Sequence, residues 1–133
     1  MIGDDRWFDK LDLLNETSMG YEVGVTPLFE ADYLKEFYDF FRIKDRSPRL
    51  IQSEDEFDES LKVLSGEYRW EATAEKTKEL FGLPDRITFF DDITELKEEL
   101  GGPTGLSSFF FVFEIMFCEY EGFTLCFICG TNN

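Results

Sequence analysis

The chain has 133 residues, with 29 acidic side chains, 13 basic ones and no histidine, which gives a formal net charge of −16 at pH 7. The absence of histidine excludes Ser-His-Asp triads, Cys-His pairs and histidine metal sites. Hydrophobic residues make up 43% of the chain and include 16 phenylalanines, so we expect one folded domain with an aromatic core. A surface this acidic repels nucleic acid and anionic membranes and favours basic proteins or cations.

The first third of the chain predicts a helix, a strand and a second helix. Apolar residues recur at helical spacing over residues 7–14, and alternation over residues 21–25 predicts a short strand. Thr26 followed by Pro27 is typical of a helix start. The apolar stripe of this second helix consists of Phe29, Tyr33, Phe37, Phe40 and Phe41. We expect the helix to end in the basic, proline-containing segment of residues 42–49.

The next segment predicts two short strands around a helix. Residues 50–51 read as a strand, and Ser53 with Glu56 matches a capping box at the start of a helix. Gly66 is placed to end that helix. Residues 67–71 alternate between charged and aromatic side chains, which predicts a second strand.

Three further elements follow before the C-terminal part of the chain. We expect a helix that is capped by Thr73 and ends at Gly82, and then a strand over residues 86–90. Asp92 and Glu95 form an acidic analogue of the capping box, which predicts another helix start.

The C-terminal part is apolar on both strand faces. Residues 107–119 and 123–129 flank a turn at residues 120–122, which predicts a hairpin of two central strands covered on both sides. We therefore predict an α+β fold in a single compact domain over residues 1–133. Several short helices and strands come first, and a long C-terminal β-hairpin lies at the centre of a mixed sheet.

The three cysteines are interpreted as core residues. Cys126 and Cys129 form a C-x-x-C pair, but strand alternation puts them on opposite faces. Cys118 is expected opposite Leu125 across the turn, with no fourth ligand for zinc. The acidic runs also lack the glycine of a calcium loop, so we predict neither a metal nor a cofactor.

Glu114 interrupts the longest apolar run of the chain. A buried carboxylate is costly unless it is paired or faces a pocket, and burial raises its pKa. The residue therefore marks a partly wet strand face, pairs with an arginine such as Arg69 or Arg86, or serves as a functional pocket carboxylate. No second residue at readable spacing makes a catalytic dyad with it.

The negative charge is broad and is interrupted once. Residues 1–41 carry a net charge of −7, residues 42–49 carry +3, and residues 50–133 carry −12. Helix capping accounts for a few of the carboxylates. Solubility is one explanation for the remainder, because acidic side chains keep a phenylalanine-rich chain dispersed. A surface that binds a basic partner is the other.

We expect a non-enzymatic, cytoplasmic inhibitor that binds a basic protein, in the manner of a bacterial immunity protein that neutralises a cognate nuclease toxin. Such an enzyme displays lysine and arginine to grip phosphates, and a carboxylate-rich partner can occupy that surface without contacting nucleic acid or membrane. The start of the chain lacks the basic flank and apolar run of a signal peptide. The candidate partner-binding residues are Glu54, Asp55, Glu56, Asp58, Glu59, Asp91, Asp92 and Glu95.

Two other functions stay open at this point. A phage anti-defence protein that mimics DNA would lay its carboxylates along an elongated surface. A small-ligand-binding domain would use Glu114 in a closed aromatic pocket with convergent polar groups.

Overall fold

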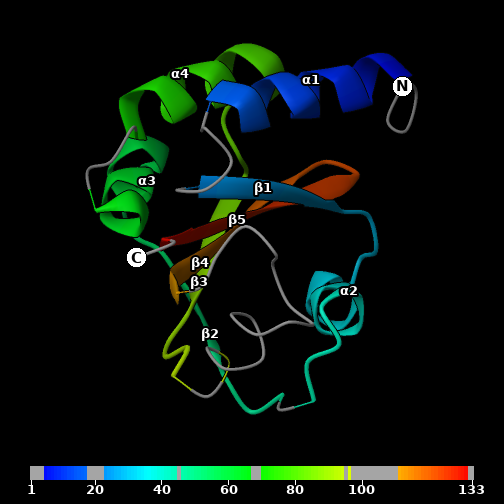
Figure 1. The fold of residues 1–133 in the computed structure, drawn as a ribbon, viewed down its shortest axis with the longest axis vertical. Helices are drawn as coiled ribbons and strands as arrows, with labels where there is room; N and C mark the ends of the chain where they lie inside the picture. Colours follow the sequence, from blue (N-terminus) through cyan, green and yellow to red (C-terminus); the bar gives the residue numbers. More distant parts are fainter. Residues whose placement is uncertain are drawn as a thin grey trace.

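The computed structural model describes residues 5–17, 23–44, 46–66, 70–94, 96 and 111–131, and these ranges contain four helices and five strands (Figure 1). The elements are α1 (Asp5–Thr17), β1 (Val23–Leu28), α2 (Tyr33–Phe40), β2 (Leu50–Gln52), α3 (Phe57–Ser65), α4 (Trp70–Phe81), β3 (Arg86–Phe90), β4 (Phe111–Tyr120) and β5 (Phe123–Thr131). The strands form one sheet in the order β1-β5-β4-β3-β2. This confirms the α+β class, and every strand pair is antiparallel where we expected a mixed sheet.

The β4–β5 hairpin lies at the centre of the sheet and contributes to two apolar cores. Cys126 and Ile128 belong to the core beneath α2, whereas Leu125 and Phe127 belong to the core beneath α1, α3 and α4. All four side chains are fully buried or nearly so. Figure 1 shows α1 and α4 side by side, α3 next to α4, and α2 apart from all three. The predicted hairpin with both faces covered is confirmed.

The cysteines are core residues, as the sequence predicted. All three are free and buried, and Cys118 pairs directly with Leu125 across the hairpin. Cys126 and Cys129 belong to opposite cores, so the two thiols of the C-x-x-C pair are separated by the sheet. Burial raises the pKa of the Cys118 and Cys126 thiols, which keeps them protonated.

The second helix begins later than the sequence predicted. β1 continues through residues 26–27, so this dipeptide does not start a helix. The strand lies at the edge of the sheet, where a proline without an N–H group is tolerated. Asp32 caps α2 instead, because its side chain accepts a hydrogen bond from the backbone N–H of Lys35 at 3.1 Å. Phe29 therefore precedes the helix, and Phe40 is exposed rather than part of the buried stripe.

α2 ends in a hydrogen-bonded turn, well before the proline at position 48. The N–H of Ile43 donates to the carbonyl of Tyr38 at 2.9 Å, and the N–H of Arg42 donates to the carbonyl of Asp39 at 3.3 Å. These two bonds define a Schellman motif. Its left-handed position is normally glycine, but here Arg42 occupies it with a φ of 56°.

α3 also begins later than expected. The helix starts at Phe57, and its N-cap residue Glu56 makes no side-chain capping bond, so the predicted capping box is absent. The hydroxyl of Ser53 instead accepts a hydrogen bond from the N–H of Asp55 at 3.1 Å. Gly66 ends the helix in the left-handed conformation, as predicted.

The prediction of a strand at residues 67–71 is wrong for residues 70 and 71. Trp70 and Glu71 form the first turn of α4, and residues 67–69 lie outside the described ranges. Thr73 is buried inside the helix and does not cap it. Gly82 follows α4 with a φ of 81°, which confirms the predicted helix end.

We predict that Arg42→Gly raises the free energy of unfolding by about 1 kcal/mol, because glycine adopts the left-handed conformation without a Cβ clash. Chemical denaturation measures the change. Lys44→Gly is the matched control: it removes the same charge at a position without positive φ and should lower stability slightly. Equal losses in both variants would contradict the strain at Arg42.

We predict that the three native thiols react with a disulfide reagent about a hundredfold more slowly than exposed thiols, because all three are buried. In denaturant, all three thiols should react as fast as exposed thiols. Val63→Cys adds one thiol at a side chain that is 68% exposed and should give one fast phase. A fast phase in the native wild type would contradict this description of the core.

Candidate functional site

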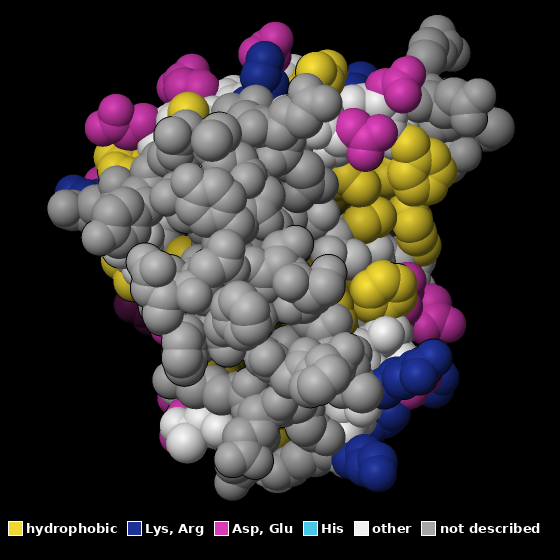
Figure 2. All heavy atoms as spheres, viewed as in Figure 1, with side chains coloured by type: hydrophobic (Ala, Val, Ile, Leu, Met, Phe, Trp, Pro, Cys, Tyr) yellow, Lys and Arg dark blue, Asp and Glu magenta, His cyan; other side chains and the backbone are white. Residues whose placement is uncertain are grey.

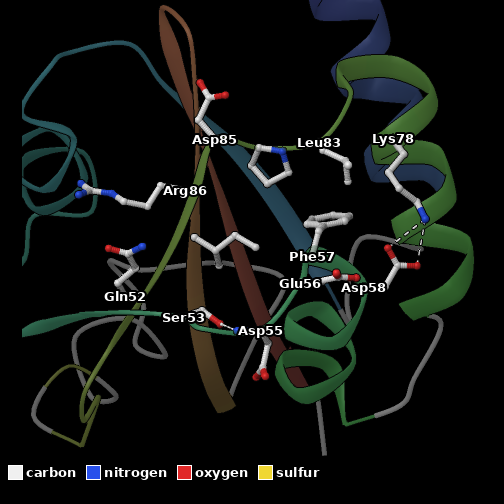
Figure 3. Close-up of a pocket in the computed structure, with 12 residues that line it drawn as sticks. Gln52, Ser53, Asp55, Glu56, Phe57, Asp58, Lys78, Leu83, Asp85 and Arg86 are labelled. Carbon is white, nitrogen blue, oxygen red and sulfur yellow. Dashed lines mark hydrogen bonds and ion pairs between the residues drawn. The ribbon is translucent and has the colours of Figure 1, made fainter.

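A cavity of about 520 Å³ lies where β2, the start of α3, the end of α4 and the start of β3 meet (Figure 3). Three of the predicted partner-binding residues, Asp55, Glu56 and Asp58, line it. Asp85 adds a fourth carboxylate from the loop that precedes β3, and the sequence analysis missed it. A single aspartate in a loop gives no sequence signal of its own, so only the fold reveals its position.

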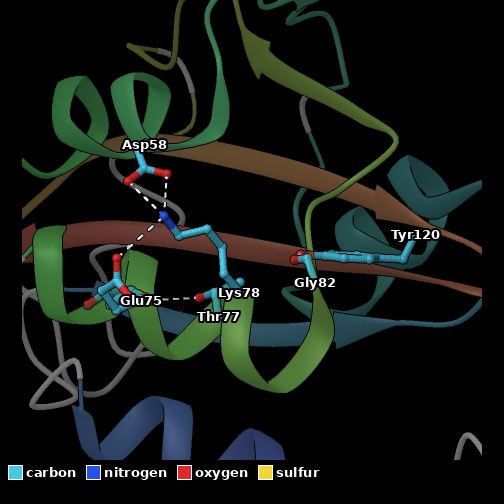
Figure 4. A network of polar contacts seen from close by, with 7 residues as sticks. Asp58, Glu75, Thr77, Lys78, Gly82 and Tyr120 are labelled. Carbon is cyan, nitrogen blue, oxygen red and sulfur yellow. Dashed lines mark hydrogen bonds and ion pairs between the residues drawn. The ribbon is translucent and has the colours of Figure 1, made fainter.

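The two described cations that line the cavity, Lys78 and Arg86, already have acidic partners. The Nζ of Lys78 donates to the two carboxylate oxygens of Asp58 at 2.9 and 3.0 Å and lies 3.5 Å from Glu75 (Figure 4). These contacts raise the pKa of the Lys78 ammonium. The Nε of Arg86 donates to Glu119 at 2.6 Å, which raises the pKa of the guanidinium.

Arg86 contributes little positive charge to the cavity, because its guanidinium points to the opposite face of the sheet. Ile87, the next residue, belongs to the core beneath α3 and α4, and consecutive strand residues point to opposite faces. Figure 3 shows the Arg86 side chain directed away from Phe57 and Lys78. The carboxylates therefore dominate the field around the cavity.

The loop between α4 and β3 forms one wall of the cavity and is fixed at both ends. The hydroxyl of Tyr120 donates to the carbonyl of Gly82 at 3.0 Å (Figure 4). The N–H of Asp85 donates to the carbonyl of Glu119 at 2.8 Å. Neighbouring residues of β4 thus hold this wall in place.

The opposite wall is fixed by a second set of hydrogen bonds. The N–H of Ser53 donates to the carbonyl of Ile87 at 2.8 Å. The Ser53 hydroxyl lies 3.0 Å from the hydroxyl of Ser60, a buried residue on α3. The segment that carries Asp55 and Glu56 is therefore tied to both β3 and α3.

The remaining predicted site residues do not join the cavity. Glu54 and Glu59 are exposed beside it but do not line it. Asp91 and Asp92 follow the far end of β3, about 17 Å along the strand from its start. Glu95 lies outside the described residues.

The acidic pair after β3 belongs to a different local network. The carboxylate of Asp91 accepts a hydrogen bond from Arg49 at 2.6 Å. Asp92 accepts from both the N–H and the hydroxyl of Thr94, at 2.8 and 2.6 Å. Figure 2 shows lysine and arginine side chains gathered at the lower edge of the molecule, beneath α2, and acidic ones along the upper rim. The two groups of candidate residues therefore lie in different parts of the described structure.

Glu114 lies on β4 and is not part of the cavity. It pairs with Cys129 next to a register shift, and it is half-buried on the sheet face that α1, α3 and α4 cover. Arg86 bonds Glu119, so the suggested pairing of Arg86 with Glu114 is wrong. Arg69, the other suggested partner, lies outside the described ranges.

A polar network on the α2 side holds Glu119 and Arg86 in place. The Tyr33 hydroxyl on α2 lies 3.0 Å from the hydroxyl of Thr88 and donates to Glu119 at 3.1 Å. Burial is the main cause that raises the pKa of the Tyr33 phenol above its usual value. The network joins α2 to β3 and β4, the two strands next to the cavity wall.

We predict that Tyr33→Phe lowers the free energy of unfolding by about 1 kcal/mol, because it removes two hydrogen bonds of a buried hydroxyl. A double-mutant cycle with Thr88→Val should give a coupling energy of about 0.5 kcal/mol or more. Additive losses would show that the two hydroxyls do not interact.

The same variant has a defined pH dependence. Because the folded-state pKa of Tyr33 is raised, its stabilising contribution is complete below about pH 10 and is lost as pH rises towards the folded-state pKa. The stability difference between wild type and Tyr33→Phe should therefore shrink above about pH 10. A difference that grows with pH would contradict the direction of the shift.

Comparisons of the chain with protein-family models, with curated proteins and with solved structures found no match. None of the helices in the described ranges is long and apolar enough to cross a membrane. Among those same residues, no group of three or more His, Cys, Asp or Glu side chains is placed to hold a metal ion.

Proposed function

We propose that this chain is a small acidic inhibitor that binds a basic protein, as a bacterial immunity protein does when it neutralises a cognate nuclease toxin. The observation that carries the proposal is the acidic ridge, which we define as residues 54–59. In this ridge Glu54, Asp55, Glu56 and Glu59 are exposed and form no ion pair with any described residue. Asp58 is the exception, because Lys78 binds it.

Helix capping accounts for only part of the ridge. Asp58 and Glu59 lie in the first turn of α3, where a carboxylate interacts favourably with the helix dipole. Glu56 is the N-cap residue but makes no capping bond, and Glu54 and Asp55 precede the helix. Three carboxylates therefore lie next to one another with neither a capping bond nor an ion pair among the described residues.

A basic nuclease would complement this ridge. An enzyme that binds nucleic acid neutralises phosphates with lysine and arginine. Carboxylates that meet the same cations accelerate association and block the nucleic-acid site. Hydrogen bonds of Ser53 to Ile87 and Ser60 tie the start of the ridge to β3 and α3, which lowers the cost of ordering it on binding.

The geometry favours this proposal over the two alternatives. A DNA mimic needs carboxylates spaced along a continuous surface. Here the ridge and Asp91 lie towards opposite ends of β3, and Asp91 is paired with Arg49. A ligand-binding domain built on Glu114 needs that carboxylate in a cavity, and Glu114 does not line the one beside the ridge.

We predict that charge reversal of the ridge slows partner association about tenfold or more at low salt, because it removes electrostatic attraction. The variant is Glu54→Lys with Glu59→Lys, and the partner is the basic protein recovered by pull-down from the native host. Surface plasmon resonance across a salt series gives the rates, which should fall as salt rises.

The matched control is Asp9→Lys with Asp12→Lys, which makes the same change in net charge on exposed positions of α1. Its association rate should change by about twofold or less. Equal effects of the two double variants would mean that only net charge matters. Association that is insensitive to salt would contradict the proposed function.

A further inference from the structure

Resting on the proposed function, we propose that the cavity beside the acidic ridge receives an arginine side chain of the basic partner. Its volume of about 520 Å³ lies within the range typical of small-ligand pockets, and it is open to solvent on one side, where a partner's side chain can enter. The ridge would attract the partner by its charge, and the pocket would recognise one of its side chains.

The lining has an apolar part and an acidic part. Phe57, Leu83, Pro84 and Ile87 supply apolar surface, and Leu83 is 65% exposed although it is a large hydrophobic side chain. Asp85 stands apart from Asp55 at the other end of the lining in Figure 3. An occupant whose aliphatic stem lies on the apolar residues and whose cationic head meets the acidic end at Asp85 matches this lining.

The described cations of the lining do not neutralise Asp55, Glu56 or Asp85. Lys78 is held by Asp58 and Glu75, and Arg86 is held by Glu119 on the other sheet face. Asp55, Glu56 and Asp85 form no ion pair with any residue in the described ranges. An anionic occupant would be repelled, whereas a cation would gain charge-assisted hydrogen bonds.

Arginine fits this lining better than lysine. Its guanidinium is planar and weakly hydrated, so it loses less on entering a partly apolar cavity, and it can donate two hydrogen bonds to one carboxylate. It also stacks on aromatic faces, and Phe57 is the aromatic residue of the lining.

The cavity is formed before any partner arrives. Tyr120 and Glu119 hold the loop that carries Leu83 and Asp85, and Ser53 ties the other wall to β3. A pocket whose walls are already fixed does not lose the free energy of ordering them when it binds.

The test uses the isotope-labelled full chain and N-acetyl-arginine amide as the probe, followed by backbone amide shifts in NMR. N-acetyl-citrulline amide is the neutral isostere, and N-acetyl-lysine amide tests the head group. We expect saturable shifts at Ser53, Asp58 and Asp85 with arginine, binding about threefold weaker with lysine, and none with citrulline.

Asp85→Asn should weaken arginine binding about threefold or more, because it removes one charged acceptor. Asp12→Asn, the same chemical change on α1, should leave the affinity unchanged within about 1.5-fold. Equal shifts with citrulline, or unsaturated shifts spread over exposed carboxylates such as Asp12, would overturn the proposal.

A second experiment distinguishes failure of the arginine pocket from failure of the inhibitor function. The Leu83→Ala, Asp85→Asn double variant should weaken binding of the isolated partner at least tenfold. A partner that responds to reversal of Glu54 and Glu59 but binds this variant unchanged would leave the inhibitor function standing and overturn the pocket. Saturable probe binding without any basic protein partner would overturn the assignment to a partner's arginine.

Discussion

The β4–β5 hairpin is the constraint on which the rest of the structure depends. Its strands carry apolar side chains towards both faces, so each face must be covered. Phe127 packs against Phe57 of α3, and Phe117 packs against Phe37 of α2. The helices are distributed over two sides for this reason, and the shorter strands extend the sheet outward to its edges.

The end of β4 links this core to the candidate site. Glu119 and Tyr120 are consecutive residues and therefore point to opposite faces of the sheet. Glu119 binds Arg86 and Tyr33 on the α2 side, whereas Tyr120 binds the carbonyl of Gly82 at the end of α4. Strand alternation thus draws the arginine away from the cavity and fixes the cavity wall with two adjacent residues.

The sequence predicted the fold correctly where a residue pattern was compatible with only one kind of secondary structure. A long run that is apolar on both parities fits a central strand, and Gly66 fits a helix end, so both predictions are confirmed. Thr26-Pro27 fits a helix start and an edge strand equally well, and only the pairing of Pro27 with Leu125 decides between them. Trp70 was ambiguous in the same way, because its alternation with charged neighbours resembles a strand although it begins α4.

The candidate site was predictable only in its contiguous part. The acidic run of residues 54–59 is visible in the sequence, but Asp85 joins it through strand pairing and helix packing. The position of the carboxylates at residues 54–56 bears on whether the acidic surface serves solubility or partner binding. The fold places cations beside Asp39 and Asp91, yet no described cation pairs with residues 54–56. Solubility depends on net charge wherever it lies, so it does not select this position, whereas the proposed binding of a basic partner would.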